Sequence, residues 1–295
     1  MKKIVVRLFG GLGNQLFIYA AARRMALINH AELLIDDVSG FSEDYVYKRY
    51  FQLDHFSISY KKATSAERLE PFSRIRRYFL RRWNQHKPYE QRTYLMQDGV
   101  DLDQRLINFK LKGNLYLEGY WQSEDYFKDV EDVIRRDLKI IPPTDVSNLL
   151  MAEQIGRCNA VSVHVRFFDE PQILAINNAP TDYYLRAIET MERMVPDAHY
   201  FIFSDQVDTA RNRIPLLNDR VTFVVHNKGD ENAYADLWLM SQCKHFIIAN
   251  STFSWWGAWL SANPSKHVIA PGFEMRYGKM WWGFKGLLPS NWIKL

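Results

Sequence analysis

Between residues 245 and 260 the sequence reads His245-Phe-Ile-Ile-Ala249 and then Asn250-Ser-Thr-Phe-Ser-Trp-Trp-Gly-Ala-Trp-Leu260. A short apolar strand therefore leads directly into a helix, and Asn, Ser and Thr are typical residues at a helix start. The first backbone N–H groups of such a helix lack intrahelical partners and attract anions, phosphate above all. The stretch predicts an α/β fold with an anion site at this turn. A capped helix with aromatic core contacts and no ligand is the alternative.

A second strand with polar residues at its end reads Val161-Ser-Val-His-Val-Arg-Phe-Phe-Asp169. Alternation places the valines on one face and Ser162, His164 and Arg166 on the other. Arg166 then lies near the carboxyl end of the strand, where open α/β sheets bind ligands. The guanidinium of Arg166 can bind two phosphate oxygens at once, in bidentate fashion, and it stays protonated. His164 and Asp169 are placed to orient Arg166 or to contact a nucleotide; an Arg–Asp pair that only braces a loop is the alternative.

The chain begins with a strand, a glycine turn and a helix. Ile4-Val-Val-Arg-Leu-Phe-Gly10-Gly-Leu-Gly-Asn-Gln15 is followed by an apolar helical pattern through Asn29. Such a turn brings the backbone close to a ligand, but the glycine spacing fits neither the dinucleotide fingerprint nor the P-loop. Spacing alone therefore points to no particular ligand.

Strands and helices alternate along the chain, most clearly after Pro142-Pro143, which marks a linker. We expect an N-terminal α/β domain over 1–143 and a C-terminal Rossmann-like domain over 144–295, with packing of the last residues back on the first domain left open. Such alternation predicts parallel, doubly wound sheets. The expected strands are 3–8, 32–36, 160–166, 199–204, 221–225, 245–249 and 267–270, and the clearest helices are 14–29, 181–195 and 231–242.

The composition is that of a globular protein. Of 295 residues, 47% are hydrophobic and 24% charged, which excludes disordered and fibrous classes. A net charge of +4 gives no strong attraction to nucleic acid. Cys158 and Cys243 are too few for a disulfide framework or metal cluster. Polar residues interrupt the first apolar run, and no stretch is long enough to span a bilayer. We expect a cytoplasmic protein.

Four blocks of sequence occur in an order that resembles the bacterial α-1,2-fucosyltransferases of glycosyltransferase family 11. They are Gly10-Gly-Leu-Gly-Asn-Gln15, Tyr116-Leu-Glu-Gly-Tyr-Trp-Gln-Ser123, His164-Val-Arg-Phe-Phe-Asp169 and Asn250-Ser-Thr-Phe-Ser-Trp-Trp-Gly-Ala-Trp259. The third block of the family usually reads His-x-Arg-Arg-x-Asp, and Phe167 stands here where the second Arg is expected. The resemblance covers nearly the whole chain and implies the GT-B architecture, in which two Rossmann-like domains face each other across a cleft.

The resemblance also implies an activity. The chain is expected to be an inverting, metal-independent galactoside α-1,2-fucosyltransferase that moves L-fucose from GDP-β-L-fucose to the 2-OH of a terminal β-galactoside. GDP-fucose is a co-substrate, and no cofactor is expected. The acceptor can be part of a lipid-linked O-antigen or capsule unit. Two alternatives are a transferase for a related GDP-deoxysugar, because Phe167 changes the motif, and a nucleotide-sugar-binding module without catalysis.

The expected catalytic residues are Arg166, Asn14 and Asp36. Arg166 stabilises charge on the departing GDP, Asn14 bridges phosphate and fucose, and Asp36 acts as general base. Glu118 is a second candidate base, and a structural cap of the loop 36–40 is the alternative role of Asp36. The expected donor-binding residues are Gly11, Gly13, Asn14, His164, Arg166, Asp169, Ser204, Asp205, Asn250, Ser251, Thr252, Phe253 and Ser254.

Asp101-Leu-Asp103 has the Asp-x-Asp spacing by which other glycosyltransferases hold a metal ion on a diphosphate. It lies outside the α/β pattern, and a carboxylate at a helix start explains it. We expect no metal site.

The segment 67–92 is rich in arginine and aromatic residues, with apolar side chains at helical spacing. A basic amphipathic helix can lie on an anionic membrane, here the inner face of the cytoplasmic membrane, through Arg74, Arg77 and Arg81. A solvated helix packed by its apolar stripe is the alternative. Nucleic-acid binding fits the composition, but no recognised nucleic-acid fold accompanies it. The apolar residues are Phe72, Ile75, Phe79, Leu80 and Trp83.

Overall fold

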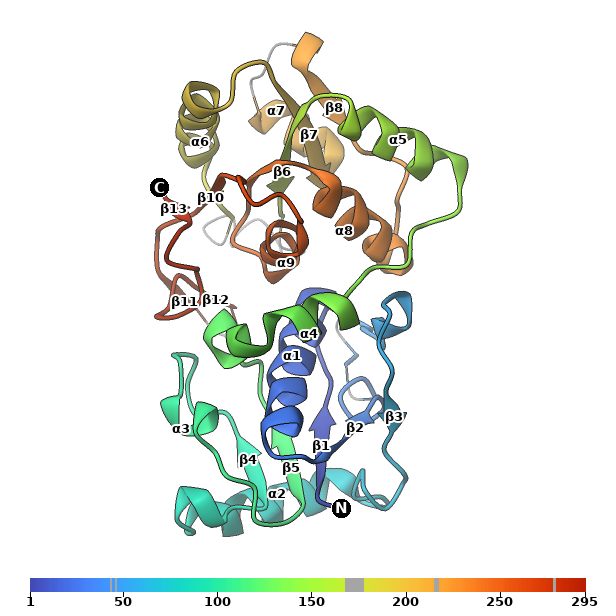
Figure 1. Ribbon diagram of the computed structural model, residues 1–295, viewed down its shortest axis with the longest axis vertical. Coiled ribbons are helices and arrows are strands. Elements are labelled where there is room, and N and C mark those ends of the chain that lie inside the picture. The colour runs from blue at the N-terminus through green and yellow to red at the C-terminus, as the bar shows by residue number, and fades with distance from the viewer. Residues whose placement is uncertain (43, 46, 168–177, 215–217, 278–279) are drawn as a thin grey trace. The chain divides into compact units, whose positions relative to one another are not determined.

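The computed structural model describes the chain except residues 43, 46, 168–177, 215–217 and 278–279. The chain divides into two compact units (Figure 1), Met1–Lys139 with Lys285–Leu287 (unit 1) and Ile140–Phe284 with Leu288–Leu295 (unit 2). The predicted linker at Pro142-Pro143 falls at the start of unit 2. The last eight residues belong to unit 2, so it is Lys285–Leu287, and not the end of the chain, that joins unit 1.

Unit 1 is built on a parallel sheet with the strand order β3-β2-β1-β5-β4. The chain runs outward from β1 to β2 and β3, and strands on the other side of β1 follow later. The order therefore reverses between β1 and β5. The strands are β1 (Lys3–Arg7), β2 (Glu32–Asp36), β3 (Lys61–Lys62), β4 (Tyr94–Met96) and β5 (Leu115–Glu118).

Helices cover the sheet of unit 1. The long α1 (Leu12–Ile28) packs on β1 and β2, and α2 (Ser73–Gln85) packs on β4 (Figure 1). The short α3 (Gln104–Ile107) and α4 (Glu131–Asp137) complete the helices described in this unit. Short 3-10 turns occur at Leu53–His55, Tyr89–Gln91, Glu124–Tyr126 and Lys128–Val130.

The helix predicted in the basic segment forms as α2, but its apolar face points outward. Phe79 and Trp83 are 63% and 61% exposed, whereas Arg77 is 2% exposed. Arg81 also turns inward and pairs with Glu118 at 3.1 Å. The apolar stripe is therefore not the packed face. The expectation that Arg77 and Arg81 face a membrane is likewise wrong, because both point toward the sheet.

Unit 2 contains a parallel sheet with the order β13-β10-β9-β6-β7-β8. This is the order of the doubly wound dinucleotide-binding fold, with β6 as its first strand. The chain runs from β6 to β7 and β8, then crosses to β9, so the order reverses between β6 and β9. The strands are β6 (Asn159–Val165), β7 (Ala198–Ser204), β8 (Val221–Phe223), β9 (His245–Ile247), β10 (Val268–Ala270) and β13 (Ile293–Lys294), with a separate hairpin of β11 (Met275–Tyr277) and β12 (Met280–Trp282).

The helices of unit 2 are α5 (Val146–Gly156), α6 (Thr181–Met194), α7 (Val207–Arg213), α8 (Ala233–Gln242) and α9 (Thr252–Leu260), with 3-10 turns at Asn218–Arg220 and Asp230–Asn232. The predicted alternation over 160–270 is thus confirmed. Among the described residues, no helix combines the length and apolar character that crossing a bilayer requires.

The tryptophans of α9 form its packed core. Trp255 and Trp256 have no exposed surface, and Trp259 is 4% exposed. Gly257 lets α9 approach α8 closely, because a Cβ at this position would lie 3.0 Å from the Met240 side chain. Burying such large side chains stabilises the helix strongly and fixes where its first turn lies.

Candidate active site

The carboxyl ends of β6, β7 and β9 gather most of the predicted residues of unit 2. Because β6 pairs with both β7 and β9, the residues that follow these strands share one edge of the sheet. The point where strand order reverses lies between β6 and β9, and open α/β sheets bind ligands at such a point. Arg166 follows β6, Asp205 follows β7, and the turn at Asn250 follows β9.

Arg166 and Asp205 form an ion pair at this edge. The distance from Nη1 of Arg166 to Oδ2 of Asp205 is 2.7 Å, and the side chains are 23% and 21% exposed. The other carboxylate oxygen of Asp205 accepts a hydrogen bond from the backbone N–H of Phe167 at 2.9 Å. Asp205 therefore fixes both the guanidinium and the backbone beside it. The sequence analysis gave a pair of Arg166 with Asp169 that only braces a loop as the alternative to ligand binding. Asp169 lies outside the described residues.

Phe167 occupies the place of the second arginine in the motif, and its side chain packs in the hydrophobic core of unit 2. Only 5% of its surface is exposed. The Phe167 side chain therefore packs in the core, and only its backbone N–H contacts the edge residue Asp205. Arg166 is the guanidinium that this motif supplies.

His164 is buried on the strand before Arg166. Its ring lies 5.6 Å from the ring of Phe253, so the end of β6 and the start of α9 are in contact. Burial and, to a smaller extent, the neighbouring Arg166 lower the pKa of His164 to about 3. The imidazole is therefore neutral near pH 7. Within the described part of the chain, its Nδ1 has no hydrogen-bond partner.

The turn before α9 has the predicted capping. Ser251 is the N-cap, and its hydroxyl accepts a hydrogen bond from the N–H of Phe253 at 3.3 Å. The hydroxyl of Ser254 donates to the carbonyl of Ser251, also at 3.3 Å. Asn250 and Ser254 are buried, while Thr252 and Phe253 are partly exposed. The two serine hydroxyls thus serve the turn itself, and the helix start faces the end of β6.

Ser204 is the last residue of β7 and lies at the same edge. Its hydroxyl accepts a hydrogen bond from the backbone N–H of Gln206 at 3.1 Å, which shapes the turn that carries Asp205. In unit 2 the structure therefore brings together His164, Arg166, Ser204, Asp205 and the residues 250–254.

The glycine turn of unit 1 lies at the corresponding reversal of its own sheet. Gly10 has φ of 77°, which favours glycine, and a Cβ there would lie 2.9 Å from Nδ2 of Asn14. Gly11 is the N-cap of α1, and Gly13 is buried in its first turn. Asn14 Oδ1 accepts a hydrogen bond from the Gln122 side chain at 2.8 Å, which links the ends of β1 and β5.

Two further residues at this turn carry no signal of their own in the sequence. Gln15 is fully buried and donates from Nε2 to the carbonyl oxygens of Gly10 and Tyr50, at 3.0 and 2.8 Å. A Cβ on Gly11 would lie 3.9 Å from the guanidinium of Arg49. The loop around Arg49 and Tyr50 is thereby held against the glycine turn. Gln15 and Gln122 lie in two of the sequence blocks that carry the family resemblance, but spacing gave neither a role, and nothing pointed to Arg49.

Asp36 has no exposed surface. Its carboxylate accepts hydrogen bonds from the Ser39 N–H at 2.9 Å, the Ser39 hydroxyl at 2.6 Å and the Tyr116 hydroxyl at 2.6 Å. A general base must reach the proton that it abstracts, and these contacts engage the carboxylate with internal donors. They favour the alternative role of Asp36, a cap of the loop after β2, over the expected role as general base.

Glu118 is equally engaged. Its carboxylate pairs with Arg7 at 3.0 Å and with Arg81 at 3.1 Å, and it accepts a hydrogen bond from the Tyr94 hydroxyl. Only 7% of the residue is exposed. Glu118 therefore holds β1, β4 and α2 together, which disfavours it as a base.

Asp103 of the Asp-x-Asp pair has a structural role. Asp103 is the N-cap of α3, where its side chain accepts from the Arg105 N–H at 2.9 Å. It also pairs with the Arg105 guanidinium at 2.8 Å. In the part of the chain that the structure describes, no three His, Cys, Asp or Glu side chains are grouped to hold a metal ion.

The sequence model of glycosyl transferase family 11 matches residues 3–277 of the chain. The chain belongs to this family. It is 31% identical to an alpha-1,2-colitosyltransferase of Escherichia coli over 289 residues, which cover 92% of each chain. It is 32% identical to the O-antigen biosynthesis glycosyltransferase WbnK of Escherichia coli over 285 residues, 90% of this chain and 92% of WbnK.

The fold of this family 11 chain is shared with solved structures. An Arabidopsis thaliana FUT1 mutant in complex with GDP matches 98% of this chain and 74% of its own, with a TM-score of 0.56 and 16% identity. The predicted fold class is confirmed: the chain is an α/β protein of the GT-B type with two Rossmann-like units.

Proposed function

We propose that this glycosyltransferase is a galactoside α-1,2-fucosyltransferase, which moves L-fucose from GDP-β-L-fucose to the 2-OH of a terminal β-galactoside with inversion. The observation that carries the proposal is the Arg166–Asp205 pair at the strand-order reversal of unit 2. A guanidinium held there by a carboxylate, beside a capped helix start, suits a nucleoside diphosphate. The GDP in the related FUT1 structure and the family resemblance support a guanine nucleotide.

In the proposed reaction the acceptor oxygen forms a bond to the anomeric carbon while the bond from that carbon to the β-phosphate oxygen breaks. The electron pair of the broken bond passes to GDP, where negative charge grows. Arg166 is preorganised by Asp205 and stabilises this charge, together with the first N–H groups of α9. No metal ion has a part in the proposal.

The proton of the acceptor hydroxyl needs an acceptor of its own. Asp36 is fully buried, and Glu118 is engaged by two arginines and a tyrosine. An in-line displacement places the departing phosphate on the opposite face of the sugar, so we assign the proton to solvent water. Asn14, Gly11 and Gly13 remain proposed donor-binding residues of unit 1.

A second donor is favoured by one specific observation. The relative that is 31% identical over 92% of the chain is named a colitosyltransferase, and colitose differs from fucose by lacking the 3-OH. A site that hydrogen-bonds a hydroxyl rejects the analogue without it by about 10⁴-fold or more, whereas a site that does not use the 3-OH discriminates weakly. A strong preference for one sugar therefore reveals whether the 3-OH is bound.

The test is GDP release from GDP-fucose and from GDP-colitose, each with and without a β-galactoside, followed by determination of the new linkage. The proposal expects galactoside-dependent GDP release from GDP-fucose and an α-1,2-linked product. GDP release only from GDP-colitose would mean that colitose is the sugar transferred and that the type of reaction is as proposed. Binding of both donors without acceptor-dependent release would favour the non-catalytic module and contradict the proposal.

The acceptor is proposed to be a sugar chain carried on a lipid, because one relative is named for O-antigen biosynthesis. Comparing the rates with a lipid-linked and a free galactoside of the same structure tests this. Equal kcat/KM values would mean that the lipid is not recognised.

A further inference from the structure

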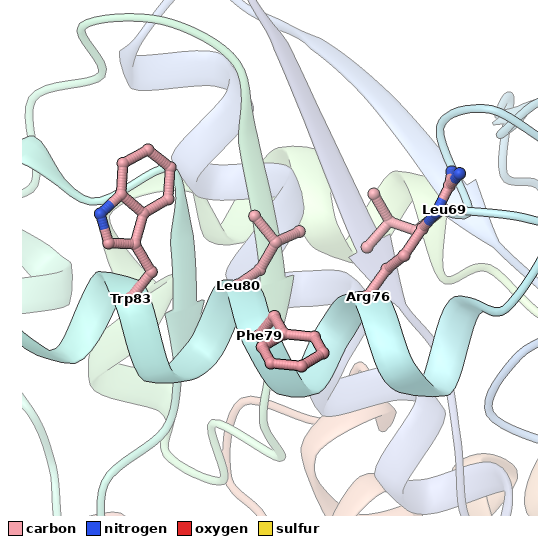
Figure 2. A pocket seen from close by; sticks show the side chains of 5 residues that line it. All are labelled: Leu69, Arg76, Phe79, Leu80 and Trp83. Carbon is pink, nitrogen blue, oxygen red and sulfur yellow. The ribbon is translucent and has the colours of Figure 1, made fainter.

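The outward face of α2 is an exposed apolar stripe. Ile75 is 55% exposed, Phe79 63% and Trp83 61%. At 100° per residue these positions fall on one side of the helix, and Phe72, 71% exposed just before the helix, continues the stripe. Figure 2 shows Phe79 and Trp83 on neighbouring turns of α2, with Leu80 and Arg76 beside them. These residues and Leu69 line an open groove of about 500 Å³.

Arginines flank this stripe on both sides. By the same helical geometry, Arg76 borders it along one edge and Arg82 along the other, and both are exposed. No acidic residue occurs within Ser73–Gln85. Lys87, just beyond the helix, lies with its ammonium 3.7 Å from the centre of the Trp83 ring. The surface is therefore apolar along its middle and cationic along its rims.

Polar anchors hold α2 in this orientation. Asn84 Oδ1 accepts from the Thr93 N–H at 2.8 Å, and its Nδ2 donates to the Leu80 carbonyl at 2.8 Å. Arg81 pairs with Glu118 on β5 at 3.1 Å. Turning the helix over would bury the aromatic stripe but break the contacts with Thr93 and Glu118, and it would leave Glu118 with less positive charge beside it. The apolar face is thus held outward by the structure of unit 1.

We propose that this face of α2, Phe72, Ile75, Arg76, Phe79, Arg82 and Trp83, docks on an anionic phospholipid surface. Trp and Phe enter the boundary between headgroups and acyl chains, and arginines on either side remain at the phosphates. A nucleic acid would use the arginines but would leave an aliphatic and aromatic stripe along one side of the helix in water. The inference goes beyond the proposed transfer reaction and does not depend on it.

The experiment is co-sedimentation of the full chain with vesicles of phosphatidylcholine, with and without phosphatidylglycerol, at physiological and at high salt. We expect binding only to vesicles with phosphatidylglycerol, weakened by salt. The double substitution Phe79→Ser and Trp83→Ser should reduce the partition coefficient by about tenfold or more. Arg76→Gln with Arg82→Gln should reduce it by about fivefold for each arginine.

Matched controls lie on unit 2. Leu149→Ser with Leu150→Ser removes two side chains that are 48% and 60% exposed on α5. Arg186→Gln with Arg193→Gln removes two exposed arginines of α6. Both controls should bind vesicles like the parent. All variants should keep the parent's rate with a soluble acceptor, so a failure of the transfer reaction itself is seen separately.

Three results would overturn the proposal. The parent can remain in the supernatant with phosphatidylglycerol vesicles, or the Phe79 and Trp83 variant can bind as the parent does. The third is a concentration-dependent dimer, seen by sedimentation velocity, that the same variant abolishes while vesicle binding is absent. That outcome would assign the stripe to a second copy of the chain.

Discussion

The carboxyl edges of the two sheets have similar topology and different chemistry. In unit 2 the edge carries the partly exposed Arg166–Asp205 pair beside a capped helix. In unit 1 the carboxylates of Asp36 and Glu118 lie at the equivalent edge, but internal donors engage both. A polar residue at a strand end is therefore not enough to make it part of a reaction site. What distinguishes the two edges is whether the charged group keeps accessible surface.

Arg166→Lys should have the largest effect. Lysine keeps the charge but loses the planar fork that can bind Asp205 and a diphosphate together, so we expect kcat to fall by about 10²-fold or more. The thermal midpoint should change little, because the pair is partly exposed. Steady-state kinetics with GDP-fucose, beside a thermal melt, measure both.

Arg186→Lys is the matched control, since Arg186 is an exposed arginine of α6 paired with Asp182 at 2.9 Å. Its rate should equal that of the parent. If Arg166→Lys retained activity within a factor of about three, Arg166 would not be the main group that stabilises the leaving GDP.

Asp36→Asn should affect stability and not rate. The amide cannot accept from the Ser39 N–H, the Ser39 hydroxyl and the Tyr116 hydroxyl as the carboxylate does, so we expect a loss of about 2 kcal/mol in unfolding free energy. Asp37→Asn is the control, because Asp37 pairs with Lys62, which is 56% exposed, and should cost less than about 1 kcal/mol. Urea unfolding and kcat of the folded protein are the two measurements. A large loss of kcat with unchanged stability would make Asp36 the base after all.

His164 gives unit 2 a sensitivity to acid. Its pKa in the folded chain is about 3, below the ordinary 6.5, so the unfolded chain takes up a proton first as the pH falls. Its contribution to stability is complete above pH 6.5 and is lost progressively toward pH 3. Between about pH 7.5 and about pH 5.5 the parent should lose about 1.4 kcal/mol more than His164→Gln. Parallel pH slopes in urea unfolding of the two proteins would show that the imidazole is not buried as a neutral group.

The sequence predicts one kind of feature well and another poorly, and these edges show why. Alternation and capping are local, so the strand that ends at Arg166 and the Ser251 cap were predictable from neighbouring residues. The burial of Asp36 depends on Tyr116, eighty positions away, which no local pattern reports. The orientation of α2 was not predicted for a similar reason. Its apolar spacing suggested that the apolar stripe packs on the sheet, whereas Arg81 pairs with Glu118 on β5 and Asn84 accepts a hydrogen bond from Thr93, just before β4.

The smallest expected effect is that of EDTA, which should leave the rate unchanged. In the proposal Arg166 and the α9 helix start balance the charge of the diphosphate without a metal ion. Asp103→Asn sharpens the test, because Asp103 caps α3 and pairs with Arg105. This variant keeps a capping side chain and loses only the ion pair with the exposed Arg105, so it should lose less than about 1 kcal/mol of stability and no activity. Two results together would contradict this: activity lost in EDTA and restored by Mn²⁺, and an inactive Asp103→Asn protein. They would mean that a metal site in unit 1, and not Arg166 in unit 2, stabilises the charge of the diphosphate. The contrast between the two sheet edges would then be reversed.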